Sequence, residues 1–156
     1  MKVLSNKEKK ELIEKLENIF KANLNIKKEN IFFLEEYEAY ILNNIPIAIK
    51  YNDKIVPTIF LIANLEVNLP YVIVDNGARV KILNGADVFR PGIIEFDKNI
   101  KKDDFVLILS EKKELLGIGI SLLDSEDINK IQKGKVIQTI HYYGDRITKL
   151  YKNLNK

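Results

Sequence analysis

The spacing of hydrophobic residues changes about thirty residues into the chain, which predicts a helix followed by short strands. Between Asn6 and Ala22, apolar side chains recur every three or four residues, and Lys and Glu occupy the opposite face. This spacing is typical of an amphipathic helix. Ser5 and Glu8 have the spacing of a capping box, in which each side chain binds a backbone amide at the helix start. We therefore predict a helix over Asn6–Ala22.

From Ile31 onward, short β-branched and aromatic runs alternate with Asn and Asp turns, a pattern that favours strands. Pro57 is predicted at the first position of a helix that runs to Ala63. The Asn68-Leu69-Pro70 segment is a plausible boundary, so residues 1–69 predict a small α+β domain. The strands predicted in this half are Ile31–Leu34, Ala39–Leu42 and Ile45–Tyr51.

The second half, residues 70–156, predicts a compact mixed β barrel with two short helices. One helical turn is expected after Asn84, and a brief helix is expected from Asp124 to Gln132. The overall fold class is α+β. The predicted strands are Tyr71–Val74, Ala78–Leu83, Ile93–Phe96, Phe105–Leu109, Leu115–Leu123, Lys135–Tyr143 and Ile147–Tyr151.

Composition narrows the possible classes of protein. The chain has 156 residues, 46% hydrophobic and 30% charged, and it lacks cysteine, which excludes disulfides and thiolate metal sites. The N-terminus becomes charged too early for a signal peptide, and the apolar runs are too short to span a membrane. We expect a soluble cytoplasmic protein with no membrane partner. Residues 1–69 hold ten basic and ten acidic residues, so the net charge of +3 lies in residues 70–156 and permits an RNA partner.

The sequence shows no arrangement of residues that is typical of a catalytic site. His141 is the only histidine, so a zinc site or a histidine pair is not expected, and we interpret His141 as a packing or hydrogen-bonding residue. Gly77, Gly85 and Gly92 lack the spacing of a nucleotide-binding loop. The sequence therefore predicts no catalytic residue, no metal and no cofactor.

Two groups of basic residues could contact RNA phosphates, with tyrosines available for base stacking. Tyr142 and Tyr143 are adjacent in a predicted strand, so they point to opposite faces and at most one of them can stack. Composition alone leaves RNA binding open. One group is Lys133, Lys135 and Arg146, and the other is Arg79, Lys81 and Arg90.

Five motifs, taken in order, resemble the PUA domain, the small RNA-binding pseudobarrel of pseudouridine synthases and archaeosine transglycosylases. Ile147 and Thr148 stand where that family commonly has an aromatic residue. The motifs are Val74–Ala78, Asn84–Ile93, Leu116–Ser121, Lys133–Lys135 and Ile140–Asp145.

The N-terminal half indicates which group of PUA-domain proteins the chain resembles. Its Leu4-Ser5 start, its basic helix and its Ile55-Val56-Pro57-Thr58 segment resemble archaeal members of the malignant T-cell amplified sequence family. Those proteins join a pre-PUA domain to a PUA domain, which implies a pre-PUA domain over residues 1–69 and a PUA domain over residues 70–156. Their eukaryotic relatives act on ribosomes and handle tRNA during initiation, reinitiation and recycling.

The resemblance implies a non-enzymatic RNA-binding protein that contacts tRNA or ribosomal RNA in translation. The small ribosomal subunit or another protein could be a partner, and we expect a monomer. Asp75 and Asp145 are interpreted as residues that fix turns. The residues expected at the RNA face are Arg79, Lys81, Asn84, Gly85, Ala86, Arg90, Gly92, Lys133, Lys135, Tyr142 and Arg146.

Two other functions stay open at this point. One is an RNA-binding accessory factor in ribosome assembly or RNA modification. The other is a protein adaptor that docks through its N-terminal domain, which an exposed patch of Tyr37, Tyr40 and Tyr51 would favour.

Overall fold

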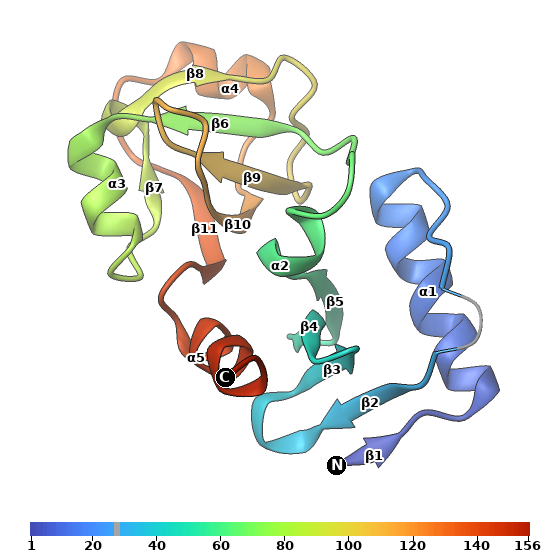
Figure 1. The fold of residues 1–156 in the computed structure, drawn as a ribbon. Coiled ribbons are helices and arrows are strands. Elements are labelled where there is room, and N and C mark those ends of the chain that lie inside the picture. The colour runs from blue at the N-terminus through green and yellow to red at the C-terminus, as the bar shows by residue number, and fades with distance from the viewer. Residues whose placement is uncertain (27–28) are drawn as a thin grey trace. The chain divides into compact units, whose positions relative to one another are not determined.

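The computed structural model of the protein describes residues 1–26 and 29–156, which form two compact units (Figure 1). The first unit contains Met1–Asn68 together with Arg146–Lys156, and the second contains Leu69–Asp145. The last eleven residues therefore pack with the first unit, whereas the sequence predicts them in the second domain.

The first unit is built on a five-stranded antiparallel sheet in the order β1-β2-β3-β4-β5. The predicted bounds of β2, β3 and β4 are confirmed. Asn43 and Asn44, like Asn52 and Asp53, adopt positive φ angles at the turns between strands, where Asn and Asp are well tolerated. The strands are β1 (Lys2–Val3), β2 (Ile31–Leu34), β3 (Ala39–Leu42), β4 (Ile45–Tyr51) and β5 (Lys54–Pro57), and the single turn η1 covers Glu35–Tyr37.

Helix α1 (Asn6–Phe20) confirms the predicted amphipathic helix, although it ends two residues earlier. The capping box is formed: the Ser5 hydroxyl accepts from the Glu8 amide, and the Glu8 carboxylate accepts from the Ser5 amide. The apolar stripe buries Leu12, Leu16 and Phe20. Residues Pro46 to Ile49 of β4 are all buried, so both faces of this strand are covered.

Helix α2 (Ile59–Ile62) begins later than the sequence predicts. Pro57 is the last residue of β5, and Thr58 is the N-cap. The Thr58 hydroxyl accepts from the Leu61 amide and donates to the Pro46 carbonyl of β4. The prediction that Pro57 starts the helix is wrong, because the buried Thr58 side chain satisfies the helix start instead.

Helix α5 (Arg146–Leu154) replaces the predicted strand Ile147–Tyr151. Ile147, Leu150 and Tyr151 are spaced as one helical face, and the first two are buried in the first unit. The Tyr151 ring stacks on Phe60 of α2, with ring centroids 4.3 Å apart and planes within 7°. This packing explains why the last residues join the first unit.

The second unit is a six-stranded sheet in the order β7-β11-β10-β9-β6-β8. Only β6 and β9 pair in parallel. Its two edge strands, β7 and β8, are consecutive in the chain and joined by the three-residue turn η2 (Arg90–Gly92). The sheet must therefore curl until its edges nearly meet, which gives the pseudobarrel that the sequence predicts. The strands are β6 (Tyr71–Val74), β7 (Val88–Phe89), β8 (Ile93–Phe96), β9 (Phe105–Leu109), β10 (Leu115–Ser121) and β11 (Lys135–Tyr142).

The barrel encloses a core of aliphatic side chains and carries two short helices, α3 (Asn76–Ile82) and α4 (Ser125–Lys130). Helix α3 corrects the predicted strand Ala78–Leu83. The Asp75 carboxylate caps the helix by accepting from the Ala78 amide at 2.8 Å. The core consists of Val72, Val74, Ile82, Val88, Ile93, Ile100, Val106, Ile108, Leu116, Ile128, Val136 and Ile137.

The helical turn predicted after Asn84 is also wrong. Asn84 closes the end of α3, where its side-chain amide donates to the Val80 carbonyl at 2.8 Å. A turn over residues 83–85 then leads to β7 without a further helix. Over the described residues, no helix has the length and apolar character needed to cross a membrane.

Candidate nucleic-acid interface

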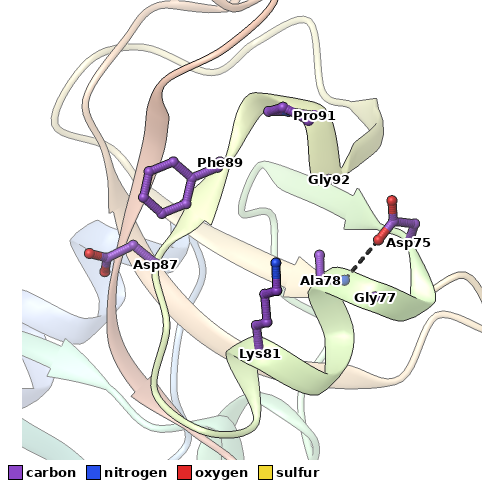
Figure 2. Close-up of a pocket in the computed structure, with 8 residues that line it drawn as sticks. All are labelled: Asp75, Gly77, Ala78, Lys81, Asp87, Phe89, Pro91 and Gly92. Atoms are coloured by element: carbon purple, nitrogen blue, oxygen red, sulfur yellow. Dashed lines mark hydrogen bonds between the residues drawn. The ribbon is translucent and has the colours of Figure 1, made fainter.

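A pocket of about 360 Å³ lies in the second unit, between α3 on one side and β7 with η2 on the other (Figure 2). The motifs Val74–Ala78 and Asn84–Ile93 therefore contribute to a concave surface. The pocket is lined by Asp75, Gly77, Ala78, Lys81, Asp87, Phe89, Pro91 and Gly92.

Small residues let η2 pass close to α3. The Asp75 amide donates to the Gly92 carbonyl at 2.9 Å, so the start of α3 is tied to the turn. A Cβ added to Gly92 would lie 2.8 Å from the Ala78 Cβ, closer than real side-chain atoms approach. Asp75 is thus a turn-fixing residue, as expected, and Gly92 is required by the close approach.

The β7 side of the pocket is held to β11 by polar contacts. The Asp87 carboxylate accepts from the Thr139 amide through Oδ1 at 2.8 Å, and its Oδ2 lies 2.8 Å from the Lys135 Nζ. The Thr139 hydroxyl donates to the Ala86 carbonyl at 2.9 Å. These bonds fix the loop that follows α3, so this wall of the pocket is preformed.

Phe89 presents a flat apolar surface at the pocket. The residue is 51% exposed, although it follows the buried Val88. It is paired with Lys135 across the β7–β11 ladder. Figure 2 shows Lys81 extending from α3 into the space between the helix and the Phe89 strand. The pocket thus combines an aromatic ring with a lysine side chain.

Two predicted arginines make contacts within the protein. Arg79 donates to both carboxylate oxygens of Glu114, at 3.0 and 3.3 Å. This hydrogen bond is the main reason that the pKa of Glu114 lies below its ordinary value of 4.5. Arg90 donates to the carbonyls of Ile128 and Ile93, and its guanidinium lies 5.5 Å from the Phe96 ring centroid.

The structure brings only some of the predicted site residues together. Lys81 and Gly92 line the pocket, Lys135 pairs with Asp87 of its lining, and the Ala86 carbonyl accepts from Thr139 of β11. Gly85, at φ +93°, leaves room for Tyr142, whose hydroxyl would lie 3.0 Å from a Cβ at this position. The other predicted residues lie outside the pocket lining: Arg79, Asn84, Arg90, Lys133 and Arg146.

Arg146 belongs to the first unit as the first residue of α5. Its guanidinium lies 4.9 Å from the ring centroid of Tyr37 and donates to the Glu36 carbonyl. Tyr40 is buried. The exposed tyrosine patch that would favour a protein adaptor is therefore not formed.

His141 is fully buried in β11, with its Nδ1 2.7 Å from the Asp145 Oδ2. The same carboxylate oxygen accepts from the Tyr142 amide at 3.1 Å. Both residues act as the sequence predicts, His141 in packing and hydrogen bonding and Asp145 in fixing the turn. Within residues 1–26 and 29–156, no cluster of three His, Asp or Glu side chains is placed to hold a metal ion.

Sequence reasoning missed Phe89 and Asp87 as site residues. The signal for Phe89 lies in the alternation of strand side chains, because a buried Val88 requires its neighbour to point outward. For Asp87 the sequence holds no comparable signal, since its partners Thr139 and Lys135 lie some fifty residues away in the chain.

Comparison with known proteins identifies the families that the two halves of the chain match. Residues 70–143 match the PUA domain family, and residues 2–64 match a family described as a domain of unknown function, DUF1947. The structure of a conserved PUA domain protein from Thermoplasma acidophilum superposes with a TM-score of 0.80 and 26% identity. That match covers 96% of this chain and 98% of the other.

Two relatives align over most of the chain. An uncharacterized protein of Methanocaldococcus jannaschii is 37% identical over 149 residues, which is 92% of each chain. Translation machinery-associated protein 20 of Schizosaccharomyces pombe is 32% identical over 130 residues, or 80% of this chain and 69% of that protein. The chain therefore belongs to the family of PUA-domain proteins that includes Translation machinery-associated protein 20 and that resembles the archaeal members of the malignant T-cell amplified sequence family.

Proposed function

We propose that this protein is a non-enzymatic RNA-binding protein of translation and that its pocket binds an unpaired part of a structured RNA, such as tRNA or ribosomal RNA. The observation that carries the proposal is the exposed ring of Phe89 beside Lys81 in one pocket. Unpaired RNA bases stack on aromatic side chains, and lysines bind the neighbouring phosphates. The PUA family and the translation-associated relative support the same class of partner.

The floor of the pocket favours a flat ligand. Gly77, Ala78 and Gly92 present backbone and at most one methyl group, so a nucleobase can approach the main chain closely. Asp87 is held by Thr139 and Lys135. The site therefore needs little rearrangement on binding, which lowers the entropy lost when the RNA is bound.

Phe89→Ala tests the stacking platform. Binding of a fluorescently labelled tRNA transcript, followed by anisotropy, should weaken about 5- to 150-fold, because base–aromatic stacking contributes about 1–3 kcal/mol. Ile94→Ala is the matched control, since Ile94 is an equally exposed apolar residue on β8 outside the pocket. Equal affinities of the two variants, or no tRNA binding by the natural protein, would contradict the proposal.

Incubation of the purified protein with tRNA tests whether the protein modifies RNA. We expect the nucleoside composition of tRNA to be unchanged after incubation with the purified protein, as measured by mass spectrometry of the digested RNA. A modified nucleoside that depends on the protein would overturn this part and favour a role in RNA modification.

Crosslinking in cells identifies the RNA. Sequencing of RNA crosslinked to the protein should show tRNA or ribosomal RNA, and Phe89→Ala should reduce the yield. Reads confined to precursor ribosomal RNA would instead favour the alternative role in ribosome assembly. The cytoplasmic location and the monomeric state stay predictions.

A further inference from the structure

The net positive charge of the protein comes from its last eleven residues. The second unit, residues 69–145, holds eleven basic and twelve acidic residues, and residues 1–68 hold ten of each. The net charge of +3 therefore comes from residues 146–156, which hold four basic residues and no acidic one. The sequence predicts this excess in the PUA domain, whereas the structure assigns these residues to the first unit as α5 and the two residues after it.

Three cations lie on one face of α5, and a fourth follows the helix. Arg146, Lys149 and Lys152 are spaced three residues apart along α5, Lys156 lies two residues beyond its end, and all four are exposed. Ile147, Thr148 and Leu150 form the opposite, buried face. Because a helix rises about 1.5 Å per residue, Arg146 and Lys152 are separated by roughly 9 Å along the helix axis. We call these four residues the α5 basic face.

The helix that carries this face is fixed in the first unit. Tyr151 stacks on Phe60. The Asn155 side-chain amide donates to the carbonyls of Asn44 and Tyr151, each at 2.8 Å. Arg146 is held at the other end by Tyr37 and the Glu36 carbonyl. The lysines are therefore presented on a docked helix.

The helix dipole does not explain this arrangement. Cations stabilise the last turn of a helix but are unfavourable in the first turn. Lys152 and Lys156 lie at the stabilising end, whereas Arg146 is the first residue of α5 and Lys149 follows one turn later. The acidic residues Glu35 and Glu36 of η1 lie at the Arg146 end. The three lysines are thus the part of the face best placed to bind a polyanion.

Three cations of the second unit that the sequence predicts at the RNA face make contacts within the protein. Lys135 pairs with Asp87, Arg79 pairs with Glu114, and Arg90 binds backbone carbonyls. The pocket itself adds two carboxylates and one lysine. Because the second unit carries a net charge of −1, its general electrostatic attraction for RNA is small, which favours a contribution to phosphate binding from elsewhere in the chain.

We infer that the α5 basic face is a second RNA-binding surface, which contacts the phosphate backbone without reading its sequence. This inference rests on the proposed function, because it assumes that the polyanion is RNA. The pocket would supply recognition of unpaired bases, and the α5 basic face would supply affinity that depends on salt.

The test is the triple variant Lys149→Gln, Lys152→Gln and Lys156→Gln, which keeps the helix and removes three charges. The matched control is Lys7→Gln, Lys10→Gln and Lys54→Gln, three exposed lysines of the same unit with the same change in net charge. The affinity for a labelled tRNA transcript is measured over a range of KCl concentrations, with circular dichroism to confirm the fold of both variants.

We expect the α5 variant to lower the slope of log affinity against log salt by about 2, since each phosphate contact contributes about 0.7–0.9 to the slope. Near physiological salt its affinity should fall roughly tenfold or more. The control variant should change both quantities much less. Equal behaviour of the two triple variants would overturn the inference.

Further outcomes separate this inference from the proposed function. If Phe89→Ala weakens tRNA binding but the α5 variant matches its control, the inference fails and the proposed function stands. If the natural protein binds no tRNA, both fail. Loss of binding to phosphatidylserine-containing vesicles without any change in tRNA affinity would assign the face to anionic membranes and overturn the inference.

Discussion

Gly92 and Ala78 approach so closely that a Cβ on residue 92 would lie 2.8 Å from the Cβ of Ala78. Gly77, also in the pocket, has ordinary space, with its nearest neighbour 3.5 Å from an added Cβ. The two glycines of one pocket thus have different roles. Gly92 is required by the packing of η2 on α3, whereas Gly77 is not required by any contact of this kind.

Gly92→Ala should therefore destabilise the protein. Forcing an extra methyl group into a close contact typically lowers stability by about 1–3 kcal/mol, and urea unfolding followed by circular dichroism measures this loss. Gly77→Ala is the control. It should be neutral or stabilising by up to about 1 kcal/mol, because alanine is the better residue in a helix. Equal stabilities of the two variants would show that the close approach at Gly92 is not rigid.

The stacked pair of Phe60 and Tyr151 gives a second prediction, on the docking of α5. A double-mutant cycle with Phe60→Leu and Tyr151→Leu should give a coupling energy of about 0.5–1.5 kcal/mol, the range for aromatic pairs beyond the area they bury. Urea unfolding of the four proteins supplies the values. A coupling energy near zero would mean that α5 is not held by this contact in solution.

Much of the fold follows from local sequence patterns. The bounds of β2, β3, β4, β6, β8 and β9 agree with the prediction, because each is a short β-branched run between turn residues. The two wrong strands have different origins. Ala78–Leu83 alternates apolar and polar residues over its first five positions, a length at which strand and helix patterns overlap. Ile147, Leu150 and Tyr151 instead have helical spacing, which a segment of only five residues does not distinguish from a strand.

A local helix cap decided the first case, and contacts between distant residues decided the second case and the site. The cap from Asp75 favours helix α3, and the ring of Phe60 favours helix α5. The partners of the predicted arginines also lie far along the chain, Glu114 for Arg79 and Ile128 for Arg90. The motifs Val74–Ala78 and Asn84–Ile93 therefore indicated the stretch of chain that forms the pocket, but the sequence did not indicate which cations line it.

Asp145 gives a third prediction, on the turn after β11. Its carboxylate accepts from the Tyr142 amide and lies 2.7 Å from the Nδ1 of the buried His141. Asp145→Ala removes the partner of a buried polar atom, which should lower the free energy of unfolding by about 1–3 kcal/mol. The exposed Asp127 is the control, since Asp127→Ala should change stability by no more than about 0.5 kcal/mol. Similar values for both variants would exclude a structural role for the His141–Asp145 contact.

Glu8 gives the last prediction, a dependence of stability on pH. The pKa of its carboxylate is lowered from 4.5, first by the hydrogen bond from the Ser5 amide and then by the hydrogen bond from Lys2. A folded-state pKa below the unfolded value means that the carboxylate contributes stability above pH 4.5, and that this contribution is lost as the pH falls through the folded-state value. Glu8→Gln should therefore be less stable than the natural protein at pH 7 and equally stable near pH 2. The control is Glu14→Gln, on the same helix outside the capping box, which should show no such convergence. A stability difference for Glu8→Gln that stays constant from pH 7 to pH 2 would show that the charge of the carboxylate does not stabilise the start of α1.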